Sequence, residues 1–215
     1  MRTSKTPLWL ALLVLLACPL PALAQKYPEK SIRLVVAFPT GASYILALLV
    51  SDKLREALGQ SVVPDFRSGA GGNIAAELVA KAPPDGYTLL LTSPAIAISP
   101  SLFTKLGYDT FRDFAPITLL ATVPNVPTTA EAGMPELVVI TWYGLFAPAG
   151  VKPDIIEQLN AEVVKLMNAP DVKSKLAQVA LDASTSTPAE FAKFVRAEYD
   201  KWGRVIKAAD IRVQQ

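Results

Sequence analysis

Apolar and polar positions follow strand-like and helix-like periods through the first half of the chain. The runs IRLVVAF and TLLLT predict buried strands, and YILALLVSDKLREAL predicts a long helix that ends at Gly59. The predicted elements are strands at 32–38, from 62 and at 88–92, and helices at 44–58 and 74–81. This alternation indicates an α/β fold with a central, mainly parallel sheet, right-handed crossovers and flanking helices.

The second half predicts one strand and three amphipathic helices. The strand LVVITWYGLF at 137–146 precedes a helix that starts with Pro153 and another that starts with Pro170. The last helix follows a Ser-Thr cap and has Pro188 at its first position. We expect its aromatic residues to pack on the sheet as scaffold rather than to form a ligand cage.

The stretch FRSGAGGNIAAELVAKAPPDGY at 66–87 carries a glycine-rich turn, a helix and a second turn. Its glycines can adopt backbone angles closed to other residues, and they let a partner approach the main chain. Asn73 is a candidate N-cap, with Ile74 and Leu78 on one side of the following helix. An ordinary helix between two strands explains the same stretch equally well.

Three turns are predicted at the edge where the strands end, at 39–43, 68–73 and 93–95. Ligands bind α/β sheets at this edge, where helix N-termini present free N–H groups to carboxylate or phosphate. The glycines match neither the phosphate-binding loop, which ends in Gly-Lys-Ser/Thr, nor the dinucleotide fingerprint. The sequence therefore predicts a site for a small anion rather than for a nucleotide.

The N-terminus is typical of a secretory signal peptide, predicted over residues 1–24. Arg2 and Lys5 precede a short apolar run, and an Ala-Leu-Ala cleavage site precedes Gln25. The alternative is a lipid anchor at Cys18, which follows Leu-Leu-Ala. The apolar run is too short to span a bilayer. We therefore expect a periplasmic protein that is not membrane-spanning after signal cleavage.

Charge and composition argue against several classes of function. The chain has 21 basic and 19 acidic residues. The excess consists of Arg2 and Lys5 in the predicted signal, which argues against nucleic acid as a partner. The absence of histidine excludes Ser-His-Asp catalysis and the common zinc sites. We expect no catalytic residues, no metal and no cofactor.

Several motifs together resemble one known family. They are VVAFPTGAS (35–43), ALGQSVV (57–63), RSGAGGNIAAELVAKAPPDGYTLL (67–90), YDTFRDFAPITLLATVPN (108–125), PTTAEAGMPE (127–136) and WYGLFAPAG (142–150). In this combination the chain resembles the Bug, or TctC-like, group of periplasmic receptors for tripartite tricarboxylate transport. The motifs cover nearly all of the chain after residue 24.

The resemblance implies a type II-like periplasmic-binding-protein fold that closes around a small carboxylate and delivers it to membrane permease subunits. It places ligand-binding residues in the loop after the first strand and in neighbouring turns, with two aromatic residues as a candidate wall. These residues are Phe38, Thr40, Gly41, Ala42, Ser43, Tyr44, Gly71, Gly72, Ser93, Pro94, Ala95, Trp142 and Tyr143. Core packing is the alternative interpretation of the two aromatic residues, Trp142 and Tyr143.

The chain departs from the family pattern in two places. The family's loop reads P-P-G-G-S-T-D-I-L-A-R, whereas PTGASYILAL at 39–48 is one residue shorter and lacks both the acid and the arginine. The family also has a second lobe of roughly a hundred residues, a domain's worth, before the segment PTTAEAG. We therefore expect a single lobe over 25–215, made of segments 25–126 and 127–215, with the second lobe largely missing.

Two hypotheses of different kinds follow. The chain is either a shortened receptor for a small carboxylate, or a one-lobed remnant without ligand binding that has only a structural or interaction role. An enzyme is a third hypothesis, which the missing histidine and the lack of paired acids in the predicted cleft disfavour.

Overall fold

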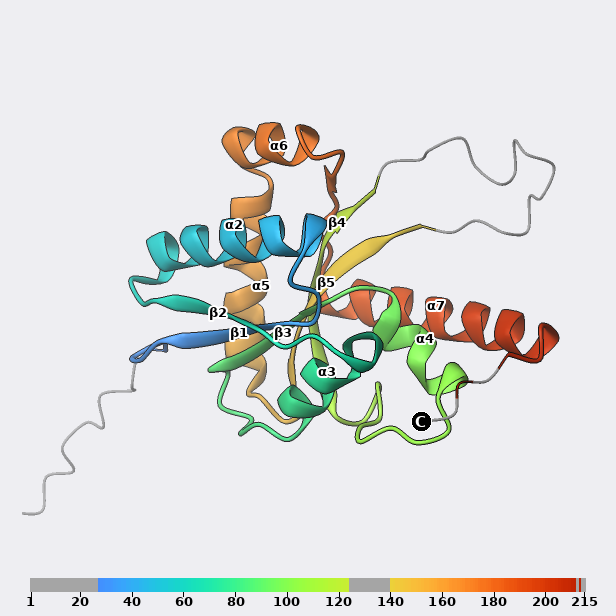
Figure 1. The fold of residues 1–215 in the computed structure, drawn as a ribbon. Helices are drawn as coiled ribbons and strands as arrows, with labels where there is room; N and C mark the ends of the chain where they lie inside the picture. Colours follow the sequence, from blue (N-terminus) through green and yellow to red (C-terminus); the bar gives the residue numbers. More distant parts are fainter. Residues whose placement is uncertain (1–26, 124–139, 212, 214–215) are drawn as a thin grey trace, which may run out of the picture.

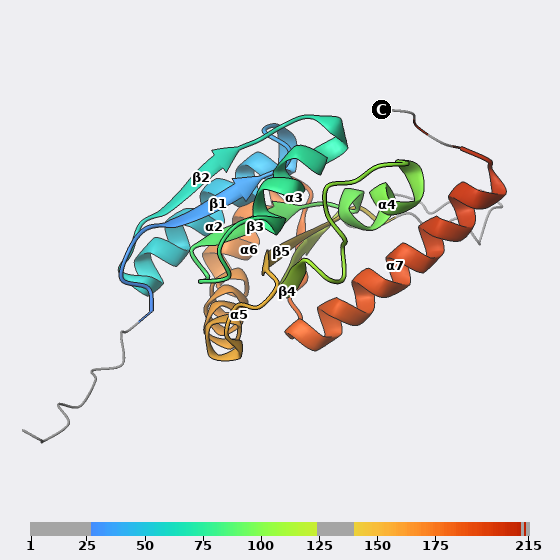
Figure 2. The same ribbon diagram turned by 90° about the horizontal axis from the view of Figure 1, so that it is seen from below.

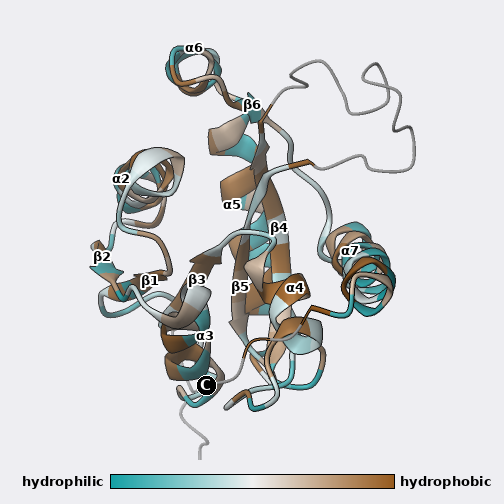
Figure 3. Ribbon diagram, turned by 45° about the vertical axis from the view of Figure 1, so that its right-hand side comes forward, coloured by the Kyte–Doolittle hydropathy of each residue, from teal (hydrophilic) through white to brown (hydrophobic). Residues whose placement is uncertain are grey.

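The computed structural model describes residues 27–123, 140–211 and 213, and these form one sheet with helices on both faces (Figures 1 and 3). The predicted signal peptide, Cys18 and the predicted junction between residues 126 and 127 lie outside the described residues. Within the described ranges, none of the helices combines the length and the apolar character needed to span a bilayer.

The sheet of the described residues has the strand order β2-β1-β3-β5-β4-β6. Its strands are β1 (Ile32–Val36), β2 (Val62–Phe66), β3 (Thr88–Thr92), β4 (Phe114–Thr122), β5 (Trp142–Pro148) and β6 (Asp182–Ala183). β1 pairs in parallel with β2 and β3. β5 is antiparallel to both of its neighbours, β3 and β4, and β6 is antiparallel to β4.

The α/β class with flanking helices is confirmed, but the sheet is mixed rather than mainly parallel. Helical crossovers join β1, β2 and β3, which makes that half parallel. In the other half, β5 follows β4 in the sequence and returns beside it, with Thr122 opposite Trp142. This half therefore needs no helical crossover between its two longest strands.

Helices cover the two faces of the sheet in separate groups (Figure 3). They are α2 (Gly41–Leu58), α3 (Asn73–Ala80), α4 (Ala95–Leu102), α5 (Pro153–Met167), α6 (Pro170–Ala177) and α7 (Pro188–Ala208), with a short 3₁₀ turn, η1 (Ala70–Gly72). Leu34 and Val36 of β1 pack in the cluster that includes α2, α5 and α6. Val35, between them, packs in the cluster that includes α3, α4 and α7. The alternation follows from the two-residue period of a strand.

The long helix begins at Gly41, three residues before the predicted start at 44. Thr40 is its extended N-cap, and Gly41 has a φ of 63°. Residues 41–43, which were predicted to end a turn, therefore form the first turn of α2. Most of the apolar run that follows is core, although Leu48 is 41% exposed.

The prediction that Asn73 caps the following helix is wrong. Gly72 is the N-cap, with a φ of 92°, and it moves Asn73 into the first position of α3. The Asn73 side chain is buried and accepts a hydrogen bond from the Tyr108 hydroxyl at 2.8 Å. The buried face of α3 is formed by Asn73, Ala75, Ala76 and Val79, whereas Ile74 is 50% exposed. The face that α3 packs against the sheet is therefore the one with small side chains, in the cluster with Val35 and Leu90, and not the predicted face with Ile74.

Helix α7 begins with the predicted cap. Thr187 and Glu190 form a reciprocal capping box, and Pro188 occupies the first turn. The Phe191 ring packs at 4.9 Å from the Phe146 ring, centroid to centroid. α7 lies beside α4 along one face of the sheet (Figure 2). The prediction that its aromatic residues serve as scaffold fits this packing.

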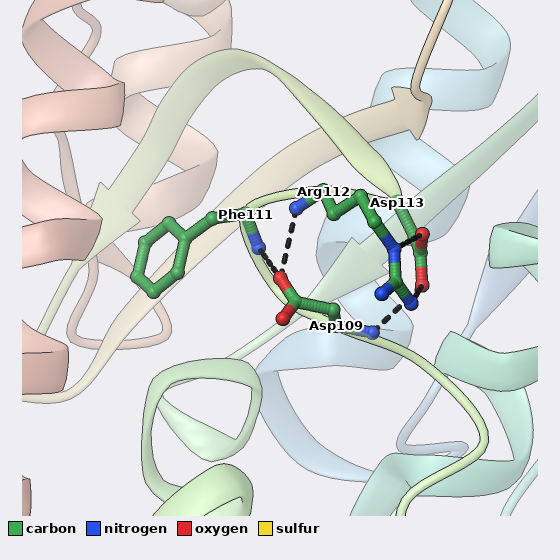
Figure 4. A network of polar contacts seen from close by, with 4 residues as sticks. All are labelled: Asp109, Phe111, Arg112 and Asp113. Atoms are coloured by element: carbon green, nitrogen blue, oxygen red, sulfur yellow. Dashed lines mark hydrogen bonds and ion pairs between the residues drawn. The ribbon is translucent and has the colours of Figure 1, made fainter.

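A polar turn precedes β4 (Figure 4). Asp109 Oδ1 accepts hydrogen bonds from the backbone N–H groups of Phe111 and Arg112, both at 2.9 Å. The backbone N–H of Asp109 donates to Asp113 Oδ2 at 2.7 Å. The Arg112 guanidinium pairs with Asp113 at 2.8 Å and holds the pKa of that carboxyl below its usual range. The Phe111 ring contacts Tyr199 edge-on at 5.0 Å, which ties the turn to α7.

Replacing Gly144 of β5 by alanine tests the close contact between β5 and α7. A Cβ at Gly144 would lie 2.1 Å from Phe191 Cζ, so we expect Gly144→Ala to lower the free energy of unfolding by about 1–3 kcal/mol or more. Urea denaturation measures the change.

Gly203→Ala in α7 is the matched control. Its Cβ would lie 3.4 Å from Ser101 Oγ, and alanine favours helix, so we expect no loss of stability. Equal destabilisation by the two substitutions would contradict the assignment of a tight β5–α7 contact.

Candidate functional site

A depression of about 570 Å³ lies at the edge of the sheet where β1 and β3 end and β5 begins. Its lining residues are Phe38, Thr40, Gly41, Ala42, Ser43, Gly71, Ser93, Pro94, Ala95, Ile98, Ser99, Leu102, Phe103, Thr141 and Tyr143. A smaller hollow of about 350 Å³ lies between α4 and the end of α7, and none of the predicted site residues lines it.

The first turn of α2 borders the depression through Gly41, Ala42 and Ser43. The N–H groups in the first turn of an α-helix have no partner within the helix. Thr40, the N-cap, makes no side-chain capping hydrogen bond, and the turn contains no acidic residue. This end of α2 therefore presents partial positive charge to the depression.

Helix α4 forms a second wall with one of its faces. Ala95, Ile98, Ser99 and Leu102 all line the depression, and their spacing places them on the same side of the helix. α4 begins directly after β3, without an acidic residue in its first turn. Its N-terminus therefore meets that of α2 at the same edge, and its later turns add apolar side chains.

Two aromatic rings lie against the glycine-rich turn. A Cβ at Gly71 would lie 3.8 Å from the Phe103 ring, so Phe103 packs over the bare backbone of Gly71. A Cβ at Gly72 would lie 3.2 Å from the Phe38 ring. Gly72 therefore lies beneath Phe38, and Phe38 rather than Gly72 borders the depression.

The polar lining consists of hydroxyl and backbone groups. Tyr143 is half-buried, and burial raises the pKa of its hydroxyl, an effect that interaction with the Ser43 side chain partly offsets. No Lys, Arg, Asp or Glu belongs to the lining within the described part of the chain. In the same described ranges, no group of three or more His, Cys, Asp or Glu residues could hold a metal ion.

The structure brings most of the predicted site residues together at this depression. Phe38, Thr40, Gly41, Ala42, Ser43, Gly71, Ser93, Pro94, Ala95 and Tyr143 line it. Gly72, Tyr44 and Trp142 do not. Tyr44 is 43% exposed and stacks on Phe66, with ring centroids 5.3 Å apart.

Trp142 belongs to the core rather than to the depression, as its alternative interpretation held. It is fully buried, and its indole Nε1 donates to Glu198 Oε2 at 3.2 Å. Its ring packs against Phe191 and Phe194 of α7. Neighbouring residues of a strand point to opposite faces of the sheet, so Tyr143 lies on the other face, next to Ser43.

Sequence reasoning missed the wall formed by α4. Ile98, Ser99, Leu102 and Phe103 were not predicted, and neither was the helix at 95–102. The helix is short and contains Pro100, which weakens its helical signal. The apolar positions 95, 98 and 102 after a buried strand were the signal that could have shown it.

Comparison with known proteins places the chain in a family. The model of the tripartite tricarboxylate transporter family receptor matches residues 46–124 and 118–211. The fold is that of an α/β periplasmic binding protein, a class to which structural neighbours belong. The chain belongs to the tripartite tricarboxylate transporter receptor family, which is a family of solute-binding receptors.

Two relatives and one solved structure show how far the similarity extends. A UPF0065 protein of Pseudomonas sp. strain P51 is 26% identical over 290 residues, 84% of this chain and 86% of that protein. Protein BugT of Bordetella pertussis is 35% identical over 145 residues, 66% of this chain and 43% of that protein. An R. palustris protein solved with adipate is 22% identical, with a TM-score of 0.79 over 87% of this chain and 100% of that one.

The Pseudomonas alignment contains a long gap. The Pseudomonas alignment runs over 290 positions, although it covers 84% of a chain of 215 residues. Roughly a hundred positions, a domain's worth, therefore have no counterpart in this chain. The two segments matched by the family model overlap at 118–124, close to the end of β4.

Buried tyrosines make the free energy of unfolding fall in alkaline solution. Burial raises the pKa of Tyr108 to about 12, partly offset by the Ser99 side chain. An unfolded tyrosine ionises near pH 10, so the unfolded state loses its proton first as the pH rises. We therefore expect stability to decline from about pH 10 toward about pH 12.

Tyr108→Phe tests this assignment by urea denaturation at a series of pH values. The variant loses the hydrogen bond to Asn73 at neutral pH, but its alkaline decline should be shallower than that of the parent chain. Parallel declines in the two proteins would contradict the role given to Tyr108.

Proposed function

We propose that the chain is a periplasmic solute-binding protein for a small carboxylate. One observation carries the proposal: the uncapped first turn of α2, which contains no acid, borders a depression of about 570 Å³. Main-chain N–H groups in such a turn favour an anion. The adipate in the structural neighbour from R. palustris supports a carboxylate as the anion.

The ligand-binding residues that we propose surround this turn. The carboxylate lies near the N–H groups of Gly41, Ala42 and Ser43, with the hydroxyls of Thr40 and Ser93 within the same lining. Tyr143 adds a further hydroxyl from β5. No residue is proposed as catalytic, and the chain acts as a receptor rather than as an enzyme.

The proposed partners follow from the family. We propose that the chain is exported by the signal at residues 1–24 and delivers its ligand to membrane permease subunits. A single lobe of two segments, 25–126 and 127–215, presents only one wall of the site. High affinity requires a site that buries most of a ligand, so we expect weak binding.

A remnant without ligand binding is the second candidate. The long gap in the Pseudomonas alignment favours it, because a domain's worth of the relative is missing from this chain. Thermal unfolding of residues 25–215 in the presence of rising concentrations of small carboxylates separates the two. A midpoint that rises with ligand concentration supports the receptor, and a cooperative melt without a response supports the remnant.

Ala42→Asp tests the position of the carboxylate. It places a negative charge in the first turn of α2, where the helix dipole tolerates it and the ligand's carboxylate is repelled. We expect the Kd for a bound carboxylate to rise by roughly ten-fold or more, with little change in the melting midpoint of the free protein.

Ala189→Asp is the matched control. It introduces the same charge into the first turn of α7, at an exposed residue outside the lining. Its affinity should equal that of the parent chain. Equal affinities in all three proteins would place the carboxylate elsewhere.

A further inference from the structure

The lining of the depression indicates which carboxylates it accepts. We propose that the depression selects monocarboxylates with an apolar body, aliphatic or aromatic, over di- and tricarboxylates. This inference rests on the proposed carboxylate site. The basis is the division of its described lining into a polar end at the first turn of α2 and an apolar end whose lining residues include neither lysine nor arginine.

The polar end offers donors for a single carboxylate. Gly41, Ala42 and Ser43 begin α2 there, and Ser93 and Ala95 mark the start of α4. Both helix N-termini lie at the edge where β1 and β3 end side by side. In α4 the N–H groups of Ile96 and Ala97 donate to the carbonyl oxygens of Ser93 and Pro94, so the donors for an anion come mainly from the first turn of α2. One such turn serves one anionic group rather than two separate ones.

The apolar end is formed by the later turns of α4. Ile98 and Leu102 lie three and seven residues after Ala95 on the lining face of α4. Ser99 lies between them but is buried, so the exposed part of this face is mainly hydrocarbon. Phe103 extends this surface over the backbone of Gly71. These apolar side chains are partly exposed in the free protein, which leaves them available to cover the body of a ligand.

Among the described lining residues, a second carboxylate has no cationic partner at the apolar end. The described lining contains neither lysine nor arginine. A diacid anchored at α2 would gain no counter-ion from the described lining at Leu102 and Phe103, and its distal carboxylate would have to shed water to contact these apolar side chains.

Matched pairs of acids test the inference by calorimetric titration of the full chain without its signal. Hexanoate is compared with adipate, and octanoate with suberate, because each pair shares its carbon number. We expect the Kd to fall by roughly two- to four-fold per added methylene among the monoacids. Each diacid should bind at least roughly ten-fold more weakly than its matched monoacid.

The outcomes separate this inference from the proposed function. Diacids that bind as tightly as their matched monoacids overturn the selectivity and leave the carboxylate receptor standing. An absence of binding by every acid overturns the receptor itself. Monoacid affinity that does not depend on chain length contradicts the assigned apolar end.

Leu102→Lys supplies the missing cation and should reverse the preference. We expect adipate to gain at least roughly ten-fold relative to hexanoate. Leu48→Lys is the control, because Leu48 is 41% exposed on α2 and does not belong to the lining. Its adipate-to-hexanoate ratio should equal that of the parent chain.

Circular dichroism checks whether Leu102→Lys folds. If it does not, Ile98→Lys repeats the test one helical turn earlier. A folded lysine variant at either position with an unchanged ratio would overturn the proposal.

Discussion

The fold depends on the insertion of β5 between β3 and β4. Leu91 pairs with Leu145 on one side of β5, and Thr122 pairs with Trp142 on the other. Without this strand, β3 and β4 would have no common neighbour, and the two halves of the sheet would separate. The buried rings of Trp142 and Phe146 add the contact with α7, and Gly144 between them leaves room for Phe191. A strand that follows the overlap of the two family-model matches at 118–124 thus completes the core.

The same strand completes the site. Because β5 runs antiparallel to β3, its first residues lie at the edge where β1 and β3 end. Tyr143 therefore reaches the first turn of α2, next to Ser43. The depression joins segments from both halves of the chain, and its chemistry comes from helix N-termini and hydroxyl groups rather than from charged side chains. An anion site of this kind depends on backbone geometry, which the packing of the helices on the sheet fixes.

The sequence predicted where helices and strands lie better than which of their faces are buried. Strong apolar runs located β1, β3 and α2, and cap residues located α5 and α7. The turns at 39–43 and 93–95 were correctly placed at one edge, because parallel strands end together. The errors were local. Asn73 is a buried residue of α3 rather than its cap, and Tyr44 is an exposed residue of α2 that stacks on Phe66 rather than lining the depression. Pairing of β5 with β3 could not be predicted, because strand order depends on tertiary packing rather than on local pattern. The wall formed by α4 was not predicted, because this helix is short and contains Pro100.

The central claim is that a carboxylate binds at the first turn of α2. Amide chemical shifts of isotopically labelled protein, followed by NMR during titration with hexanoate, test it most directly. The account predicts that the largest shifts occur at Gly41, Ala42 and Ser43, with smaller ones at Gly71 and Ala95. Shifts concentrated at the hollow between α4 and the end of α7, around Lys207 and Ile211, would contradict it. A spectrum that does not change with hexanoate would contradict it as well.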